Sequence, residues 1–495
     1  MADNIMNNNE STENLELKEF EVRKNKLNEM IKNNDIPYKS KFDRTHTLLE
    51  ARNLPMGTQV SLCGRLVSKR VMGKLIFAHV FDVNAQIQLS ISKGDALEAF
   101  TEFKTYADTG DFVGFSGELY TTGTGEITVR AHTFVILSKS LRNLPEKFHG
   151  FNDQDSKYRQ RYLDLIANED SRNTFKIRLK TIQTIRKYLT DNDFVEVETP
   201  ILQNVACGAN ARPFVTKHNA LNKDYFLRIA PELYLKQIVA GGFDRVFELG
   251  KNFRNEGMDA SHLQEFTMLE WYAAYWDYHK NIDFVTKLLQ QIVQEVKGNM
   301  LVEYQGETFD FSSFKTINYI EEINKIIGEN ILDIESVEHL KYLLLSRKVF
   351  SKDELDKLNS LTAVTDYIFK KKIRPNLKQP TITYNYPAFM IPLARRNDDD
   401  NRIIDMFQIL VNGWEMCKAY SELVNPITQR EAFEEQLKDK MAGDDEAMDI
   451  DENFVLAMEH GMPPMSGLGL GIDRLITFLA DQPTLRDVIF FPIMR

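Results

Sequence analysis

The stretch 247–275, FELGKNFRNEGMDASHLQEFTMLEWYAAY, holds the residue types best suited to chemistry. Arg254 carries a planar guanidinium whose donors match a phosphate or a carboxylate. Phe266, Glu270 and Tyr272 recur at even spacing, so a strand would place all three on one face of a sheet. A carboxylate among aromatic rings is typical of a ligand pocket, although the pattern alone also fits a sheet with a salt-bridged face.

A second arginine, Arg474, closes the glycine-rich segment 466–474, SGLGLGIDR. Its glycine spacing differs from that of a dinucleotide fingerprint. We interpret it as a strand whose missing side chains let a flat ligand lie against the backbone; close packing on a neighbouring strand is the alternative. Gly467, Gly469 and Gly471 are the glycines concerned. Two arginines and the ring of Phe266 suit a nucleoside polyphosphate, and Glu415 adds a carboxylate that suits a Mg²⁺ bridging its phosphates.

Two further acids, Glu270 and Glu422, each lie two residues from a tyrosine, Tyr272 and Tyr420. Brought together, these residues would form a negative pocket with aromatic walls. Two carboxylates in one pocket destabilise each other unless a cation neutralises them. A substrate ammonium would supply that cation, and the tyrosines add hydroxyl acceptors and cation-attracting rings. The sequence therefore indicates a site for a nucleotide and an amine.

The composition is that of an ordinary globular protein, with 495 residues and a formal net charge of −11. The length predicts about three domains. The acidic balance argues against a general polyanion binder, while a local basic face stays compatible with nucleic acid. Cys63, Cys207 and Cys417 match no metal or disulfide spacing, which favours a reducing cytosol. Because the chain has no secretory start and no apolar run of about 18 residues, we expect a cytoplasmic protein with no membrane partner.

Changes in hydrophobic period divide the chain into successive segments. Five short alternating runs between Gln59 and Leu137 predict a small barrel of the oligonucleotide-binding (OB) fold. The larger part that follows combines helices with strands. The predicted segments are a disordered tail at 1–12, a helical extension at 13–54, the barrel domain at 55–140, a hinge at 141–165, and the large domain at 166–495 with a helical insertion at about 315–378.

Arg65, Phe77 and Gln88 fall on strands that would form the usual binding face of such a barrel. A guanidinium, a ring and an amide suit stacking on unpaired bases and reading their edges. Alternation does not say which face points inward, so Phe77 as a core residue is the alternative. The helix expected in 13–34 is rich in lysine, and both an RNA contact and a solvated surface fit that pattern.

Several motifs resemble those of a known family. FRNEG, EFTMLEWY and GLGLGIDR resemble motifs two and three of the class II aminoacyl-tRNA synthetases, and residues 171–200 resemble motif one. KFHGFNDQDSKYRQRYLDLI, ARPFVTKHNALN and YFLRIAPELYLKQ are similar to the class II lysyl-tRNA synthetases, and the resemblance runs from about residue 40 to the C-terminus. It implies an α+β fold, with an antiparallel catalytic sheet flanked by helices, an N-terminal anticodon-binding OB-fold barrel, and a homodimer. The implied activity is ATP-dependent activation of L-lysine to lysyl-adenylate and its transfer to the 3′ end of tRNA(Lys), with Mg²⁺ as cofactor.

The resemblance also implies roles for residues on the amino-acid side. Glu232 is similar to the acid that receives the α-amino group of lysine, and Gly208 falls in the loop that closes over the amino acid. Arg254 resembles the arginine that bridges the lysine carboxylate and the α-phosphate of ATP. Arg254 and Arg474 are the implied catalytic residues. The residues that match the pocket for the ε-ammonium group are Glu270, Tyr272, Tyr420 and Glu422.

Further positions match the nucleotide and tRNA sites of the family. Phe266 and Arg474 would sandwich adenine. The residues implied to bind ATP are Arg254, Glu256, His262, Phe266, Glu415, Gly471 and Arg474. In the barrel, Phe77, Gln88 and Glu126 match positions that read a U-rich anticodon, and Arg65 lies on the same expected face.

Three positions depart from the family pattern. Where the family has two magnesium-binding glutamates seven residues apart, this chain has Gln408 and Glu415. A neutral amide is a weaker ligand for Mg²⁺, so one metal site is either lost or rebuilt, for example with Asp405. Lys418 stands where an asparagine commonly contacts the substrate carboxylate; its charge would make that contact or compensate for an altered metal site. Ser261 stands where an arginine often meets the phosphate tail of ATP.

Three other functions share part of this pattern but differ from lysine activation in a specific feature. Aspartyl and asparaginyl enzymes of the same class differ because an aspartate pocket needs basic residues, whereas Glu270 and Glu422 indicate a cationic substrate. A paralogue that lysylates elongation factor P would lack the barrel expected in 55–140. A non-catalytic RNA-binding scaffold would fail to bind ATP, and the intact Arg254 and Arg474 argue against it.

Overall fold

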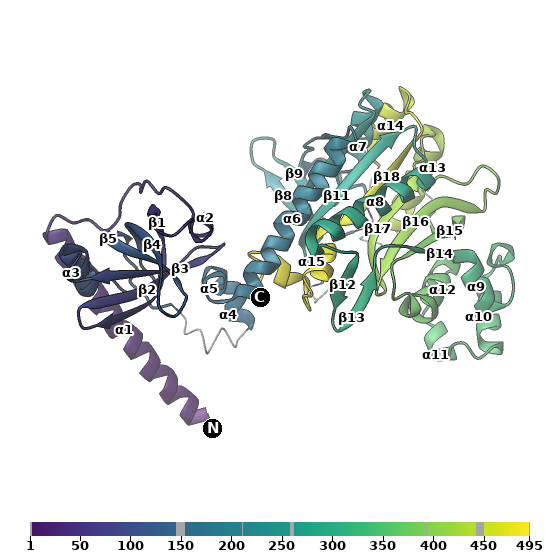
Figure 1. Ribbon diagram of the computed structural model, residues 1–495. Coiled ribbons are helices and arrows are strands. Elements are labelled where there is room, and N and C mark those ends of the chain that lie inside the picture. The colour runs from purple at the N-terminus through teal and green to yellow at the C-terminus, as the bar shows by residue number, and fades with distance from the viewer. Residues whose placement is uncertain are drawn as a thin grey trace. The chain divides into compact units, whose positions relative to one another are not determined.

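The computed structural model divides the chain into two compact units, Met1–Arg172 and Asn173–Arg495 (Figure 1). It describes residues 2–144, 154–209, 211–257, 262–391, 394–441 and 450–494. The division falls within helix α6 (Glu169–Asp191), beyond the hinge expected at 141–165, of which residues 145–153 lie outside the described residues. Across the described ranges, no helix is long and apolar enough to cross a membrane.

The first unit contains a closed five-stranded barrel with strand order β1-β2-β3-β5-β4, the connectivity of an OB fold. Alternation decides which side chains fill it: in β2, Ile76, Ala78 and Val80 are buried, whereas Phe77 and His79 are partly exposed on the outer face. The elements are β1 (Gln59–Met72), β2 (Leu75–Phe81), β3 (Gln86–Ser92), α3 (Leu97–Tyr106), β4 (Phe112–Thr121) and β5 (Ile127–Ser138).

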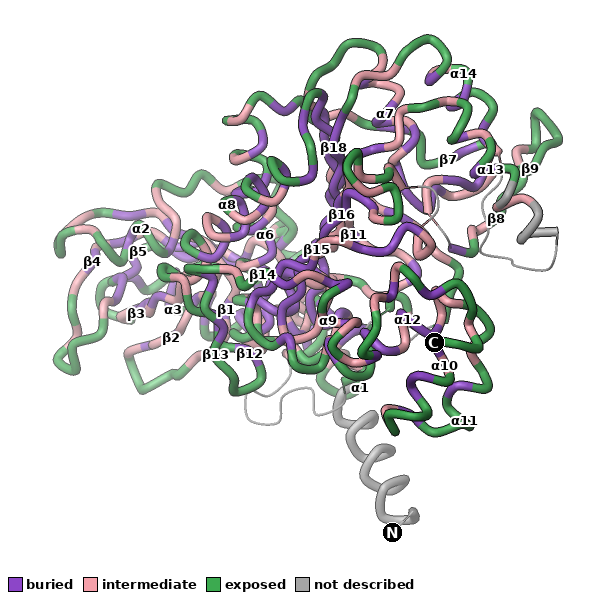
Figure 2. Tube along the Cα trace, turned by 90° about the vertical axis from the view of Figure 1, so that its right-hand side faces the viewer, coloured by how far each residue is buried: buried purple, intermediate pink, exposed green. Residues whose placement is uncertain are grey.

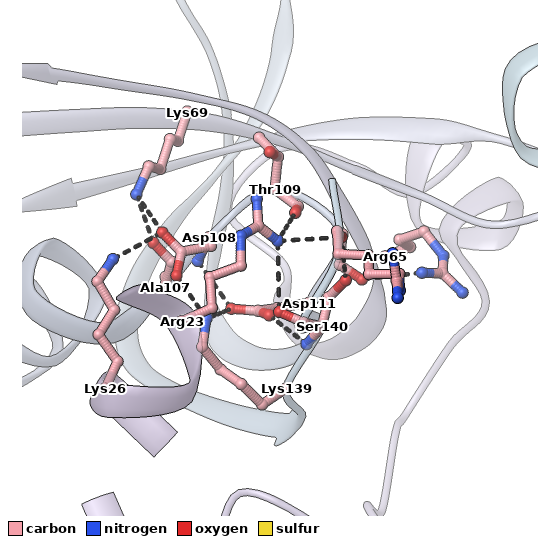
Figure 3. A network of polar contacts seen from close by, with 12 residues as sticks. Arg23, Lys26, Arg65, Lys69, Ala107, Asp108, Thr109, Asp111, Lys139 and Ser140 are labelled. Atoms are coloured by element: carbon pink, nitrogen blue, oxygen red, sulfur yellow. Dashed lines mark hydrogen bonds and ion pairs between the residues drawn. The ribbon is translucent and has the colours of Figure 1, made fainter. Parts of the chain in front are cut away.

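Helix α1 (Ala2–Lys32) precedes the barrel and includes the segment 2–12 that we expected to be disordered; a short α2 (Leu48–Arg52) follows. A buried charge network, drawn in Figure 3, joins α1 to the barrel. Arg23 Nη1 donates to the carbonyl oxygen of Thr109 at 2.9 Å, and Lys26 Nζ lies 2.7 Å from Asp108 Oδ1. The helix is therefore held by charged hydrogen bonds as well as by its buried Met30.

The centre of this network is Lys139, whose side chain is fully buried at the end of β5 (Figure 3). Its Nζ lies 2.7 Å from Asp108 Oδ2 and 2.8 Å from Asp111 Oδ2. Burial pushes the pKa of Asp108 upward, but the hydrogen bonds from Lys139 and Lys26 outweigh it and lower the pKa to about 2.

The second unit is built on an eight-stranded sheet of order β14-β15-β16-β17-β18-β11-β10-β6, antiparallel except for the pairs β14–β15 and β10–β6. The expected α+β fold is therefore confirmed. Figure 2 shows buried residues running along β11, β16 and β18. The strands are β6 (Val195–Glu196), β10 (Arg245–Phe253), β11 (Glu265–Ala274), β14 (Lys315–Asn318), β15 (Thr381–Pro387), β16 (Ile403–Val411), β17 (Trp414–Ser421) and β18 (Met465–Gly471).

The two faces of this sheet differ in chemistry. Odd-numbered residues of β11, such as Leu269 and Trp271, are buried in one core with residues of helices α8 (Tyr278–Lys297) and α15 (Ile472–Leu479). Even-numbered residues of the same strand lie on the opposite face. One face thus holds the fold together, and the other is available for a site.

Smaller elements surround the sheet. Helix α7 starts after Pro231 and ends at Gly241, as proline and glycine favour. Several helices inserted between β14 and β15 pack in a second core, which they share with residues of β14, β15 and β16. The remaining elements are β7 (Leu202–Gln203), β8 (Phe214–His218), β9 (Lys223–Leu227), α7 (Glu232–Ala240), β12 (Leu301–Tyr304), β13 (Glu307–Asp310), α9 (Tyr319–Ile327), α10 (Val337–Ser346), α11 (Lys352–Leu355), α12 (Leu361–Ile368), α13 (Pro426–Met441) and α14 (Glu452–Glu459), with α4 (Gln154–Arg159) and α5 (Arg161–Ala167) before α6.

Replacing Lys139 by methionine should destabilise the barrel by about 3–5 kcal/mol, because two buried carboxylates would lose their cation. Amide hydrogen exchange in β4 and β5 measures this local opening free energy, and exchange in β11 should not change. The control is Lys41→Met, since Lys41 pairs with Asp43 at a site where both side chains are exposed (77% and 83%). Equal effects of the two substitutions would contradict the assigned importance of the Lys139 network.

Candidate active site

A cavity of about 650 Å³ opens on the even-numbered face of the second unit's sheet. Strands β11 and β17 and helix α7 contribute polar side chains to its lining, and β18 contributes glycines and Leu468. The predicted site residues that line this cavity are Gly208, Glu232, Arg254, Glu256, His262, Phe266, Glu270, Tyr272, Glu415, Tyr420, Glu422, Gly471 and Arg474. Segments far apart in the sequence therefore meet at one site.

Strand register explains how these side chains meet. Tyr272 and Tyr420 both pair with Gly467 of β18, one from each side. A β-carbon at Gly467 would lie 2.2 Å from Cε1 of Tyr272 and 2.4 Å from Oε1 of Glu422. The glycine is required because the side chains of the two flanking strands lean over the strand between them. At this position the structure shows the alternative interpretation of the glycine run, close packing of neighbouring side chains, and the approach of a flat ligand stays a prediction.

A lysine that the sequence did not single out occupies the acidic end of the cavity. Lys236, on α7, is buried, and its Nζ lies 2.6 Å from Glu232 Oε1 and 2.7 Å from Glu422 Oε2. Burial lowers the pKa of Lys236, but the two carboxylates outweigh that effect and raise it. In sequence, Glu232 and Lys236 look like an ordinary surface pair four residues apart on a helix; only the apolar neighbours Leu235 and Val239 hint at burial.

Glu270 is the acid without an assigned cation in this part of the cavity. Burial, reinforced by the nearby Glu232, raises its pKa to about 8 despite the attraction of Arg254. Its Oε2 accepts a long hydrogen bond, 3.4 Å, from the hydroxyl of Tyr272. A positive group entering here would stabilise the ionised carboxylate. The acidic end of the cavity therefore suits a ligand that brings a cation to Glu270, in addition to the ammonium of Lys236.

The other end of the cavity is suited to an anion. The guanidinium of Arg254 lies over the ring of Phe266, 5.0 Å from its centroid. Its Nε is buried and has no hydrogen-bond partner among the described residues, so a ligand oxygen is the partner that the site lacks. Arg474 Nη1 donates to the backbone oxygen of Glu415 at 3.2 Å. This hydrogen bond holds Arg474 beside Glu415.

The loop between β10 and β11 carries two more predicted residues, Glu256 and His262, at the cavity edge. Residues 258–261 of this loop lie outside the described residues, and Ser261 is one of them.

The pair Gln408 and Glu415, predicted as metal ligands, does not fit a protein-held Mg²⁺. Gln408 Nε2 donates to Glu415 Oε2 at 2.8 Å, and its Oε1 accepts from the hydroxyl of Tyr386 at 2.9 Å. Asp405, the expected substitute, instead accepts from Arg395 at 2.7 Å. The described ranges contain no group of three or more His, Cys, Asp or Glu residues that could hold a metal ion.

On the barrel, three of the four predicted anticodon residues share the outer face of β2, β3 and β5. Gln88 Nε2 donates to Glu126 Oε2 at 2.8 Å, and Phe77 is partly exposed on the neighbouring strand, so it is not a core residue. His79, which the sequence did not single out, bridges Glu126 at 2.8 Å. Arg65 makes different contacts: it donates to Gly110 and stacks on Phe112, with 4.2 Å from Cζ to the ring centroid.

Comparisons with known proteins agree with this architecture. A model of the OB-fold nucleic acid binding domain matches residues 60–137, and a model of the tRNA synthetases class II (D, K and N) matches residues 153–495. The fold and the cavity thus have the form of a class II synthetase. A lysine–tRNA ligase of Pectobacterium atrosepticum is 44% identical over 490 residues (96% of each chain), and one of Staphylococcus epidermidis is 42% identical over 490 residues (96% of this chain, 98% of the relative).

A lysine–tRNA ligase of Aquifex aeolicus is 45% identical over 445 residues, covering 88% of this chain and 73% of the relative. The chain belongs to the class II tRNA synthetases and, among them, to the lysine–tRNA ligase family. The resemblance seen in the motifs is confirmed at the level of the family.

The raised pKa of Glu270 has a measurable consequence for binding of L-lysine. At pH 7 most of the free protein holds Glu270 protonated, and a bound ammonium favours the ionised form. Binding should therefore release close to one proton near pH 7, and affinity should rise with pH until about pH 8. Calorimetric titrations in two buffers of different ionisation enthalpy measure the release. Glu270→Gln should abolish it; heats that do not depend on the buffer in the original protein would contradict the assignment.

Proposed function

We propose that the protein activates L-lysine with ATP to form lysyl-adenylate and then transfers lysine to the 3′ end of tRNA(Lys). The observation that carries this proposal is the distribution of charged residues within the cavity described above. One end joins Glu232, Glu270 and Glu422, and the other joins Arg254 and Arg474. An amino acid with an ammonium group on its side chain, whose carboxylate faces a nucleoside triphosphate, matches that arrangement.

The acidic end gives each amine of lysine a partner. Glu232, whose side chain is one-third exposed, suits the α-ammonium group, and Gly208 lies close to it. Glu270, Tyr272 and Glu422 suit the ε-ammonium group because they are buried where they line the cavity. A shorter or neutral side chain would leave a buried carboxylate unpaired, and this cost would provide selectivity.

The first reaction requires alignment more than proton transfer. One oxygen of the lysine carboxylate attacks the α-phosphorus, the bond from that phosphorus to the bridging oxygen breaks, and pyrophosphate leaves. Arg254 would neutralise the anionic oxygens of both reactants, and the ring of Phe266 and the guanidinium of Arg474 would hold adenine. In the second reaction a terminal hydroxyl of the tRNA attacks the carbonyl carbon, and AMP leaves.

The barrel supports recognition of the tRNA anticodon. The partly exposed ring of Phe77 offers a stacking surface, and Gln88 and Glu126, already hydrogen-bonded to each other, offer an amide and a carboxylate to base edges. Arg65 is engaged elsewhere, so its part would be to keep the barrel surface in place.

Three further features complete the proposal. Mg²⁺ would enter with the phosphates of ATP, with Glu415 as the carboxylate nearest to them.

A homodimer is supported by apolar side chains exposed on α6 and around β6, namely Leu179, Val195, Ile201 and Leu202, and light scattering would measure the mass. The cytoplasm is the compartment where tRNA is charged for translation, and fractionation of cells would test it.

Lysine-dependent exchange of pyrophosphate into ATP tests the activity directly. Glu422→Gln should lower kcat/KM for lysine roughly 10- to 100-fold, because a charged hydrogen bond is lost, while KM for ATP stays unchanged. Glu265→Gln is the matched control on β11, since Glu265 pairs with Lys251 outside the cavity. Exchange that depends on aspartate or asparagine instead of lysine, or no exchange at all, would refute the proposal.

The role of the barrel is tested separately from lysine activation. Phe77→Ala should raise KM for the tRNA roughly tenfold through lost stacking, with no change in the tRNA-independent exchange reaction. Lys104→Ala on α3 also changes an exposed barrel residue and serves as the control. If both substitutions have the same effect on aminoacylation, the outer face of β2 and β3 is not the anticodon site.

A further inference from the structure

Lys418 is one of the residues that line the cavity. It is on β17, where it pairs with Gln408 on one side and with Gly469 on the other. Because Gly469 has no side chain, the space beside Lys418 is open toward Glu270, the next residue across the sheet. A β-bulge between Ile409 and Leu410 shifts the register of β16 and β17, so that Glu415 joins Lys418 in lining the cavity although the two are three residues apart.

The ammonium of Lys418 has no committed counter-ion. Among the described residues, no carboxylate lies within ion-pair distance of its Nζ, whereas Lys236 has two. Its Nζ lies 5.3 Å from the centroid of the Tyr420 ring. Burial alone would lower the pKa of Lys418, but Tyr420 and Glu415 outweigh it and the pKa is raised, so the side chain stays charged. The Lys418 ammonium therefore gives the cavity a positive charge that no carboxylate of the described residues pairs with.

The order of residues along β17 shows which part of the substrates would meet this charge. Glu415 lies at the end held by Arg474, and Glu422 lies at the end held by Lys236. Lys418 is between them. If the triphosphate is at the first end and the amines at the second, the lysine carboxylate and the α-phosphate meet near Lys418.

The same location is where a Mg²⁺ held by the protein would need carboxylate oxygens. Gln408 turns its NH₂ group toward Glu415 and so blocks one of the two carboxylate oxygens. An amide donor and an ammonium side by side on neighbouring strands repel a metal ion. We propose that Lys418 is a built-in cation that takes the place of a protein-held Mg²⁺ between Glu415 and the reacting anionic groups of lysine and ATP.

This inference rests on the proposed lysine activation and deepens it. The only divalent ions that the site needs are those brought by the nucleotide phosphates. Removing the ammonium and restoring a second carboxylate should therefore turn the Gln408–Glu415 pair into a metal site. The charge at the reaction centre would then depend on free Mg²⁺, whereas in the natural protein it does not.

The test counts Mn²⁺ ions bound per site by electron paramagnetic resonance, with L-lysine and α,β-methylene-ATP, which cannot be cleaved at the reacting bond. The double substitution Gln408→Glu with Lys418→Met should bind at least one more Mn²⁺ than the natural protein. Gln408→Glu alone should gain none, because Lys418 neutralises the new carboxylate; this single variant keeps the test valid if the double variant does not fold. Equal Mn²⁺ counts in the natural protein and the double variant, or a gain in the single variant, would overturn the inference.

A second measurement separates this inference from the proposed function. Calorimetry should show that Lys418→Met weakens binding of α,β-methylene-ATP in the presence of lysine by roughly tenfold, and Lys418→Arg should restore most of it. Lys251→Met, a cation on β10 outside the cavity, should have no effect. If the natural protein binds neither lysine nor the analogue, the proposed function fails. If it binds both and Lys418→Met binds the analogue equally well, only the role of Lys418 fails.

Discussion

The cost of burying carboxylates governs the architecture of the cavity. Glu232, Glu270 and Glu422 line one small space, and three such charges would repel each other if nothing compensated them. Lys236 forms ion pairs with Glu232 and Glu422, and burial keeps Glu270 largely protonated until a cation binds. The free protein therefore tolerates a site in which one carboxyl group, that of Glu270, has no cation partner. This missing partner is the physical form of selectivity for an amine.

The sheet makes this arrangement possible because its two faces do different work. Odd-numbered residues of β11 pack against helices, so a slip of one residue would move Trp271 onto the cavity face and Glu270 and Tyr272 into the apolar core. Even-numbered residues are consequently fixed within the cavity. Glycines in β18 then provide the depth that bulky neighbours need, as the contact of Tyr272 across Gly467 illustrates.

Charge is used differently in the two units. In the barrel, Lys139, Asp108 and Asp111 are fully paired and stabilise the attachment of α1. In the cavity, Arg254 and Lys418 retain unused capacity: one has a buried Nε without a partner, and the other has no ion pair among the residues that the structure describes. Completed networks support the fold, whereas incomplete ones mark the places where substrates complete them.

Much of this protein follows from its sequence alone. Period-two alternation identified the barrel strands and the β11 face, and residue chemistry identified Arg254, Glu270 and Phe266 as parts of a nucleotide and amine site. The strand assignments are confirmed because strand geometry is a local property. The structure brings Arg254, Glu270 and Phe266 to one cavity, and their roles there stay a proposal. The family motifs added Glu232, which no local pattern connects to the same pocket.

Only the tertiary structure decided how the distant pieces combine. A lysine four residues after a glutamate looks like a surface pair, so the burial of Lys236 depends on α7 packing over β11 and β18. A bulge in the β16–β17 pairing, invisible to periodicity, brings Glu415 and Lys418 to one face. The direction of the Gln408 amide, which donates a hydrogen bond to Glu415, is likewise set by Tyr386 from another strand. Long-range contacts determine charge balance, and charge balance determines what this cavity can bind.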